Sequence, residues 1–427
     1  MSPSSASLPH ISHSFDPANS DASCLQILSQ LSPIWTMDKA SIKLHRFTDG
    51  ITNTLIKATL SPSGDASPFR SGPAHGDPIP APVLIRAYGK DTETLIDRRK
   101  ELRAHRHLAE MCLAPALLAT FENGFLYGFV EGDPCTAEDF RTRSVWRGIA
   151  ERLGEWHALL DISILASDDE SSAGRVKVER EEKLVPTIWT NARKWISLLG
   201  SETSLSGERN LELVRELEWL IELLGRVKGI RDRSVVFSHT DLLCANIILE
   251  PESAIKPKSQ AESGTQKNDP DPPRAVTIID YEYATAAPAA FDIANFFAEW
   301  AGPDGEIACM PSHSQRKDFV QYYVRSFHSY TKNNNSSTVN TKAEPDVDLE
   351  ADVETLMQQV DLYRGLPGFY WGVWGLIQAG ISEIDFDYTS YAARRFGEFE
   401  AWKEEYTGVR KREGREMGPR EEAWAKE

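Results

Sequence analysis

The residues best suited to chemistry lie in one short string between two apolar runs. His239, Asp241 and Asn246 have the spacing H-x-D-x-x-x-x-N, with apolar residues at 235–237 before them and at 247–249 after them. Transfer of a phosphoryl group needs a carboxylate close to the attacking hydroxyl and a metal ligand close by. A short loop between two strands can hold Asp241 and Asn246 close together. The string can therefore supply both the carboxylate for the hydroxyl and the metal ligand.

A second acidic pair follows farther along the chain. The apolar run 276–279 ends in Asp280, and one residue separates Asp280 from Glu282. The run is typical of a strand. Carboxylate oxygens at its end can bind Mg²⁺ while the phosphates of ATP fill the remaining coordination positions. The pair therefore predicts a magnesium site.

Each motif has a simpler interpretation when it is taken singly. A lone H-x-D is more often a turn or a helix cap than a catalytic group. The ordered combination, with an acidic pair arriving after a strand, favours a phosphotransferase, and the first motif has the spacing of the kinase catalytic loop. We interpret His239 as a structural residue that braces this loop rather than as a base.

The N-terminal part of the chain must supply strands to position these groups. Strands are expected at 51–60, 83–88, 116–121 and 125–129, and a helix at 97–111. Asn123-Gly124 marks a hairpin turn between the last two strands. A polar stretch at 61–82 reads as an enlarged hairpin loop. The result is a small lobe of strands with one helix.

From residue 136 onward the apolar spacing becomes helical. Helices are expected at 147–160, 187–199 and 208–224, which predicts a larger helical lobe. The predicted organisation is a flexible N-terminal segment with a first helix at 1–40, a nucleotide-binding lobe at 41–135 with the 61–82 insertion, a catalytic lobe at 136–405 with polar insertions at 251–274 and 331–345, and a charged tail at 406–427.

Composition excludes several classes of protein. The 427 residues carry 64 Asp and Glu against 47 Lys and Arg, a net charge of −17, which disfavours nucleic acid and anionic lipid as partners. The five cysteines form no C-x-x-C pair, so neither a zinc site nor a disulfide framework is indicated. The first forty residues show no secretory signal, and the apolar stretch 365–381 is broken by Pro367 and is expected in the core. We therefore expect a cytoplasmic protein without a membrane-spanning segment.

The motifs, in their order along the chain, resemble those of a known family. The strings are HTDLLCAN at 239–246, IDYEYA at 279–284 and FDIANFFAEW at 291–300. From about residue 47 to residue 396, apart from the insertions, the chain resembles the choline/ethanolamine kinase family. The resemblance implies an α+β, protein-kinase-like two-lobed fold with a small β-rich N-terminal lobe and a larger, mostly helical C-terminal lobe. ATP is then expected between the lobes and the alcohol in the helical lobe.

The same resemblance assigns roles to the residues that carry it. Asp241 is implied to accept or orient the proton of the substrate hydroxyl, while Asn246, Asp280 and Glu282 organise Mg²⁺ against the ATP phosphates. In-line transfer of the γ-phosphoryl group would give phosphoethanolamine and ADP without a covalent enzyme intermediate. This is the opening step of phosphatidylethanolamine biosynthesis in the family.

The resemblance also predicts how the small lobe holds ATP. The string DGITNTL at 49–55 is similar to the family's phosphate loop, in which backbone N–H groups approach the nucleotide. The resemblance assigns Gly50, Thr52 and Asn53 to ATP binding. The alternative is that this string is an ordinary hairpin turn. Arg86 resembles the counterpart of the kinase strand lysine, and its guanidinium is expected to meet phosphate oxygens and to pair with Glu101. An exposed strand arginine is the alternative for Arg86.

A cationic substrate needs a carboxylate or aromatic faces in place of its water. Trp371 and Trp374 stand three residues apart on an expected helix and share one face, a pattern that is otherwise typical of a core. The resemblance places around the amine Glu299, Trp371, Trp374, Phe386 and Tyr391. We interpret Asp292, seven residues before Glu299, as a residue that holds the catalytic loop together.

The substrate prediction depends on fewer residues than the kinase prediction. Leu242-Leu243 resembles the ethanolamine branch of the family, so a small amino alcohol, ethanolamine, is the predicted substrate. A choline kinase or a dual-specificity amino-alcohol kinase is the alternative, because an aromatic wall suits both amines. Thr240 and Asp49 depart from the family's usual residues and, with the polar insertions, motivate a second alternative, a catalytically silent kinase-like scaffold. The sequence leaves the oligomeric state open.

Overall fold

The computed structural model describes residues 8–36, 41–47, 53–60, 82–89, 92–166, 176–177, 184–185, 187–202, 207–251, 270–302, 304–335, 348–382 and 384–427. The chain forms two compact units. The first is Met1–Asp97 with His105–Glu131, and the second is Arg98–Ala104 with Gly132–Glu427. Helix α3 (Arg98–Glu110), predicted at 97–111, therefore contributes residues to both units.

The first unit is built on a six-stranded sheet. The strands, in spatial order, are β1 (His10–Ile11), β5 (Leu117–Phe121), β6 (Gly124–Gly128), β4 (Val83–Tyr88), β3 (Asn53–Leu60) and β2 (Ile42–Phe47). Neighbouring strands are antiparallel except for the parallel pair β1 and β5. The predicted pairing of 51–60 with 83–88 is confirmed from Asn53 onward, and so is the hairpin around Asn123-Gly124. Strand β2 was not predicted.

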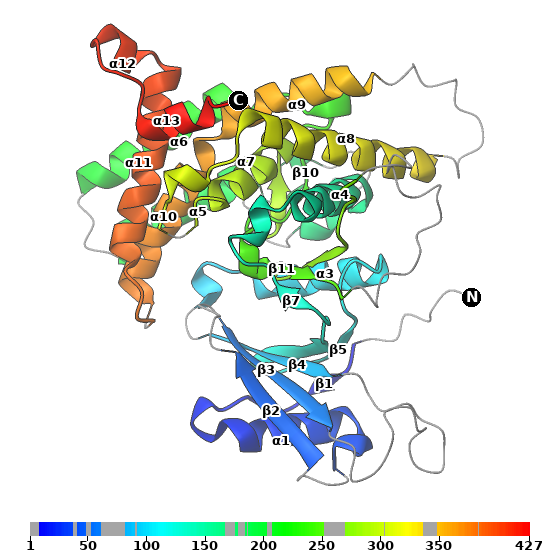
Figure 1. The fold of residues 1–427 in the computed structure, drawn as a ribbon. Coiled ribbons are helices and arrows are strands. Elements are labelled where there is room, and N and C mark those ends of the chain that lie inside the picture. The colour runs from blue at the N-terminus through cyan, green and yellow to red at the C-terminus, as the bar shows by residue number, and fades with distance from the viewer. Residues whose placement is uncertain are drawn as a thin grey trace. The chain divides into compact units, whose positions relative to one another are not determined.

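The core of the first unit contains apolar residues from a helix and from the sheet, each spaced as its element requires. Helix α1 (Ser20–Leu31) contributes Cys24, Ile27 and Leu28, whose spacing of three and four keeps them on one face. Strand β3 contributes Ile56 and Ala58, two residues apart, from the sheet face that packs in the same cluster. Figure 1 shows α1 lying beside the sheet.

The second unit is mostly helical (Figure 1). Its helices, besides the start of α3, are α4 (Arg143–Leu159), α5 (Ile188–Glu202), α6 (Gly207–Leu224), α7 (Ala289–Glu299), α8 (His313–Asn335), α9 (Leu349–Tyr363), α10 (Leu366–Ile381), α11 (Tyr388–Tyr406), α12 (Val409–Arg412) and α13 (Pro419–Trp424). The predicted helices at 147–160, 187–199 and 208–224 are confirmed as α4, α5 and α6. Helix α4 packs against α8, and α10 against α11.

Three small β sheets complete the second unit among its described residues. Their strands are β10 (Val236–Ser238) with β13 (Thr285–Ala287), β11 (Ile247–Leu249) with β12 (Val276–Ile278) and β7 (Asp133–Pro134), and β8 (Val176–Lys177) with β9 (Leu184–Val185). All of these pairs are antiparallel. The strands expected on either side of the H-x-D string are therefore present as β10 and β11.

Two predictions about individual segments have opposite outcomes. The apolar stretch 365–381 forms α10, which is buried along most of its length as expected. No helix within the described residues has the length and apolar character that a bilayer crossing requires. The predicted start of the 331–345 insertion is too early in the chain, because helix α8 continues to Asn335. The Thr331 hydroxyl donates to the Phe327 carbonyl oxygen at 2.7 Å, which satisfies this polar side chain inside the helix.

Candidate active site

The register of β11 against β12 brings the two motifs together. Ile247 is opposite Ile278, and the backbone N–H of Ile279 donates to the carbonyl oxygen of Asn246 at 2.9 Å. Asn246 directly precedes β11, and Asp280 follows β12 after one residue. The end of the first motif and the start of the second therefore lie side by side, although 33 residues separate them in the chain.

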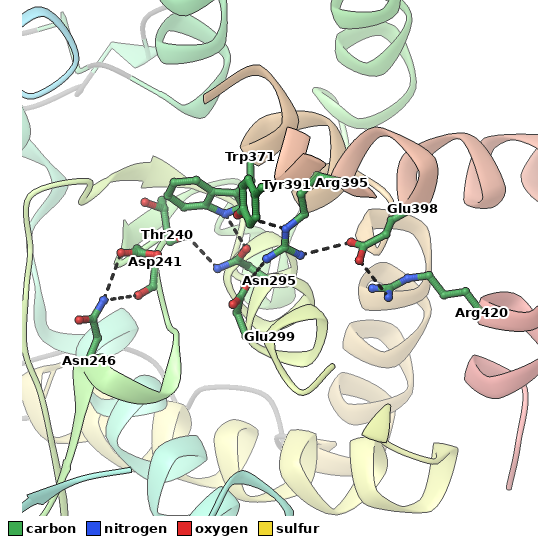
Figure 2. A network of polar contacts seen from close by, with 10 residues as sticks. All are labelled: Thr240, Asp241, Asn246, Asn295, Glu299, Trp371, Tyr391, Arg395, Glu398 and Arg420. Carbon is green, nitrogen blue, oxygen red and sulfur yellow. Dashed lines mark hydrogen bonds and ion pairs between the residues drawn. The ribbon is translucent and has the colours of Figure 1, made fainter. Parts of the chain in front are cut away.

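Asn246 is tied directly to Asp241. Its Nδ2 amide donates to the Asp241 carbonyl oxygen at 2.9 Å and to Oδ2 of the Asp241 carboxylate at 3.1 Å (Figure 2). Both bonds use the amide nitrogen of Asn246, so the amide oxygen keeps its lone pairs for another partner. An amide oxygen is a ligand type that Mg²⁺ accepts.

The Asp241 carboxylate lies in a concentration of negative charge. Burial raises the pKa of Asp241 well above its usual range, and the like charge of Asp280 acts in the same direction. Glu299 and then Glu282 add smaller effects of the same sign. Neighbouring negative charges make it unfavourable for all of these carboxyl groups to be ionised at once, unless cations bind among them. A cationic substrate or a metal ion bound here would offset this charge.

Asp292 holds the backbone of the catalytic loop. Its two carboxylate oxygens accept the backbone N–H groups of His239 and Thr240, both at 2.8 Å, and His157 Nε2 lies 3.1 Å from one of them. Asp292 is fully buried. Although burial alone raises its pKa, the bonds from His157 and the loop leave the pKa of Asp292 below its usual range. The predicted structural role of Asp292 is confirmed.

Those bonds hold a strained residue. Thr240 has a φ of 66°, in the left-handed region that a β-branched side chain rarely adopts. Its hydroxyl donates to the Tyr283 carbonyl oxygen at 3.0 Å, and Asn295 donates to the Thr240 carbonyl oxygen at 2.8 Å. Every polar atom of Thr240 thus has a partner that keeps the loop in this conformation.

His239 braces the loop as predicted. The backbone N–H of Asp241 lies 3.2 Å from His239 Nδ1, and His239 Nε2 lies 2.8 Å from the Ile279 carbonyl oxygen. Burial lowers the pKa of His239, so the neutral ring accepts at Nδ1 and donates at Nε2. The ring therefore joins the loop at Asp241 to Ile279, the residue before Asp280.

We expect Asp292→Asn to destabilise the protein by about 3 kcal/mol, because an amide cannot accept both loop N–H groups and its own NH₂ would face one of them. Chemical denaturation of the variant measures this. Since the pKa of Asp292 is lower in the folded protein than in the unfolded chain, its contribution is present above the unfolded pKa and is lost as the pH falls through the folded value. The difference between wild type and variant should therefore shrink below about pH 4.

Asp348→Asn is a matched control for that experiment. Asp348 is the exposed N-cap of α9 and accepts the Ala351 N–H at 3.0 Å. Asparagine caps helices about as well as aspartate, so we expect little change in stability. An Asp292→Asn protein that is as stable as the control would refute the structural role of Asp292.

Three carboxylates form the acidic cluster. Ligand oxygens of Glu101, Asp280 and Glu282 all lie within 4.8 Å of one another. Arg98 Nη1 lies 2.9 Å from a Glu101 oxygen and 3.3 Å from a Glu282 oxygen, and the side chains of both glutamates are only 3% exposed. The positive charge of Arg98 offsets part of the negative charge of the three carboxylates. The donor set is all oxygen, as Mg²⁺ prefers, and the cluster fits a divalent cation.

Asp280 has a left-handed backbone conformation close to the end of β12. Its φ is 65°, a left-handed value that aspartate tolerates better than most residues. A bend of this kind directly after β12 separates Asp280 from the period-two alternation of the strand. Such outliers concentrate at functional sites.

The nucleotide residues predicted in the first unit are only partly described. Gly50 and Thr52 lie outside the described residues. Asn53 is the first residue of β3, paired with Tyr88 of β4. Arg86 lies on β4 and is 5% exposed, so the alternative of an exposed strand arginine is wrong. Five consecutive residues of β4, 83–87, are buried, so both faces of this strand are covered.

The aromatic residues predicted for the amine form one cluster in the second unit. Trp371 and Trp374 lie edge to face with ring centroids 5.6 Å apart, and Tyr391 lies 6.0 Å from Trp374. The ring centroid of Phe386 lies 5.9 Å from that of Tyr391. Phe386 is 42% exposed, whereas both tryptophans are buried. Each indole N–H has an acceptor, Asn295 Oδ1 for Trp371 and the Tyr283 hydroxyl for Trp374. Satisfied indoles keep their faces in fixed positions.

Glu299 is where the cluster meets the catalytic loop. It ends α7, its side chain is 15% exposed, and it forms an ion pair with Arg395 of α11 (Figure 2). Trp371 is connected to Thr240 through Asn295, which links the aromatic wall to the residue before Asp241. Trp371 is thus bonded to the Asp241 loop, and the charge of Glu299 acts on the same loop by raising the pKa of Asp241.

Sequence reasoning did not identify Arg395, Asn295 or Arg98 as part of the site. Asn295 lies on α7 between the loop-binding Asp292 and Glu299, at spacings of three and four, so helical periodicity could have found it. Arg98 and Arg395 had no such signal. Charged residues on amphipathic helices are usually solvated, and only the fold shows that these two face buried acids.

The folded chain has the architecture of known amino-alcohol kinases. The structure of an ethanolamine kinase from Plasmodium vivax matches with a TM-score of 0.61 and 21% identity, covering 91% of this chain and 89% of the other. A choline kinase structure from Cryptosporidium parvum matches with a TM-score of 0.59 and 20% identity, covering 90% and 96%. The predicted fold class is confirmed: the chain has an α+β, protein-kinase-like fold with a β-sheet unit and a mostly helical unit.

Sequence comparison identifies the family. A family model described as choline/ethanolamine kinase matches residues 44–400. A probable ethanolamine kinase of Nematostella vectensis is 29% identical over 94% of this chain and 99% of its own length, and ethanolamine kinase 1 of Mus musculus is 30% identical over 90% of each chain. The chain belongs to the choline/ethanolamine kinase family, and it is a phosphotransferase that uses ATP and an alcohol acceptor.

Proposed function

We propose that the protein is an ethanolamine kinase that transfers the γ-phosphoryl group of ATP to the hydroxyl of ethanolamine. The products are phosphoethanolamine and ADP, and the product supplies phosphatidylethanolamine synthesis. The observation that carries this proposal is the pairing of β11 with β12, which brings Asn246 and its partner Asp241 beside Asp280. Relatives that span nearly the whole chain and are named ethanolamine kinases support the choice of substrate.

Asp241 is the residue that handles the proton. Its carboxylate orients the substrate hydroxyl and accepts the proton as the oxygen attacks phosphorus. The two bonds from Asn246 fix the direction of the carboxylate. Asp292 holds the two backbone N–H groups before Asp241 and His239 holds the N–H of Asp241 itself, so the base is positioned before substrate arrives.

Magnesium would be held by Asn246, Asp280 and Glu282, with Glu101 completing the acidic cluster. The atoms offered are the amide oxygen of Asn246 and carboxylate oxygens that lie within 4.8 Å of one another. A divalent ion bound there neutralises phosphate charge during transfer. Arg98 keeps the glutamates in place by pairing with both.

The ammonium group of the substrate is recognised by Glu299 and by the aromatic cluster. A primary ammonium can donate hydrogen bonds to a carboxylate, whereas a quaternary ammonium relies on aromatic faces. Glu299 supplies the acceptor, and Trp371, Trp374 and Tyr391 supply the faces. Leu242 follows Asp241 in the chain and is fully buried. It therefore contributes to the site by packing beneath the loop, because its side chain is not on the surface.

A competition assay tests the substrate. Purified protein is given Mg·ATP with ethanolamine and choline together, and kcat/KM is obtained for each amine. We expect ethanolamine to be preferred by at least about tenfold. A clear preference for choline would replace the ethanolamine assignment with the choline alternative, and comparable values would indicate a dual-specificity kinase.

A further inference from the structure

Glu299 does not stand alone at the amine site. Its carboxylate forms an ion pair with Arg395, a residue of α11 that is 3% exposed (Figure 2). The same guanidinium donates from Nε to the Tyr391 hydroxyl at 3.1 Å, and its central carbon lies 5.3 Å from the centre of the Tyr391 ring. One buried arginine therefore touches both a carboxylate and an aromatic residue assigned to the substrate.

A third partner fixes the arginine. Its Nη1 lies 3.2 Å from Glu398, so Tyr391, Arg395 and Glu398 follow each other along α11 at spacings of four and three. The three bonds use separate nitrogens of the guanidinium fork. A fork held at Nε and Nη1 presents Nη2 to Glu299 in a single direction.

Glu398 is itself shared with the C-terminal helix. Arg420 of α13 lies 3.2 Å from the other carboxylate oxygen of Glu398, and both side chains are less than 15% exposed. The charges alternate in the order Arg420, Glu398, Arg395 and Glu299, as Figure 2 shows. Arg420 neutralises the acid that competes with Glu299 for Arg395.

The helix that carries Arg420 is docked firmly. Glu421 pairs with Arg364, and the Trp424 indole donates to Asp361 at 2.7 Å. Arg316 is buried, donates to the Trp424 carbonyl oxygen at 2.9 Å and lies 3.9 Å from the centre of its ring. Helix α13 is therefore a packed part of the second unit.

We propose that Arg395 is a positioning residue for the amine site and that Arg420 of α13 acts on that site through Glu398. The inference rests on the proposed function, since it concerns the carboxylate that receives the ammonium. Arg395 holds one oxygen of Glu299 and leaves the other for the ammonium. When Arg420 is removed, Glu398 draws Arg395 toward itself, and Glu299 loses its fixed orientation. The C-terminal helix thus tunes the affinity for the amine.

Steady-state kinetics with ethanolamine and ATP varied separately test the first part. Arg395→Lys is expected to raise KM for ethanolamine at least about tenfold, because a single ammonium cannot span three partners. KM for ATP should stay within about twofold of wild type, since no partner of Arg395 lies in the acidic cluster. An equal rise in both KM values, or an unchanged KM for ethanolamine, would overturn the role of Arg395.

A double-mutant cycle tests the second part and does not depend on a change at the buried arginine. Arg420→Gln should raise KM for ethanolamine about threefold, and this effect should vanish in the Glu398→Gln background, where no competing acid remains. Effects of Arg420→Gln that are equal in both backgrounds, or absent in the first, would contradict action through Glu398. Arg415→Gln is the control on the same C-terminal segment, where Arg415 pairs with Glu404 and Glu413, and it should leave KM unchanged.

The two proposals fail in different ways. If wild-type protein does not phosphorylate ethanolamine, the proposed function is wrong. If wild type is active and the kinetic pattern is missing, only the positioning role is wrong. Thermal unfolding of each variant separates loss of fold from loss of position, since an effect confined to KM for the amine does not arise from a smaller folded fraction.

Discussion

Asp241→Asn is expected to lower kcat for ethanolamine phosphorylation by about 10²- to 10⁴-fold, because the amide cannot accept the proton of the attacking hydroxyl. The change is nearly isosteric, and the amide oxygen can still accept the Nδ2 bond from Asn246. Affinity for Mg·ATP should therefore change little. Equilibrium binding of a fluorescent ATP analogue and a coupled ADP assay measure the two quantities.

Asp232→Asn is the matched control for this variant. Asp232 is 82% exposed at its side chain and pairs with Lys228 at 3.2 Å in the same unit. Its φ of 59° is a left-handed value that asparagine tolerates. Turnover should equal that of wild type. If Asp241→Asn matched this control, the carboxylate of Asp241 would have no part in the chemistry, and the scaffold alternative would regain its place.

Asp280→Asn is expected to reduce kcat by at least about a hundredfold and to raise the Mg²⁺ concentration needed for half-maximal rate. The substitution removes one of the three carboxylates that lie within 4.8 Å of one another, so a divalent cation loses charge and a ligand. A magnesium titration at fixed total ATP measures the shift. Asp348→Asn, the same chemical change at an exposed helix cap, should leave the titration unchanged.

The outcome of that titration separates two roles for Asp280. A variant that recovers rate at high Mg²⁺ has lost a metal ligand. A variant whose rate falls at every Mg²⁺ concentration with an unchanged midpoint has lost something else, and the assignment of Asp280 to the metal would then be wrong.

Local spacing was enough to predict the centre of the site. The H-x-D-x-x-x-x-N string lies between β10 and β11, and Asp280 follows β12 after one residue. The apolar runs beside these motifs are short and rich in Val and Ile, which favours strands over helices. The bracing role of His239 and the structural role of Asp292 were also predicted. Both depend on residues that lie within the recognised motifs.

The parts that the sequence could not predict are pairings between distant residues. Arg395 stands 96 positions after Glu299, and Arg420 stands on a segment whose composition indicated only a charged tail. A charged side chain becomes part of a site when packing buries it opposite another charge. Sequence composition gives the charge but not the burial.

Element boundaries were missed for a related reason. Helix α8 extends to Asn335, beyond the start of the predicted insertion, because side-chain bonds such as that of Thr331 satisfy polar residues within a helix that is already packed. Tertiary packing thus carried the helix past the point at which residue type alone indicates a loop.

The most direct test of the account is ³¹P NMR of wild type and Asp241→Asn, each incubated with ATP, Mg²⁺ and ethanolamine. We predict that a phosphomonoester resonance of phosphoethanolamine grows in the wild-type sample as the γ-phosphate resonance of ATP declines, and that the variant shows little of either change. Release of inorganic phosphate without a phosphomonoester, or equal phosphomonoester in both samples, would contradict the proposed reaction at Asp241.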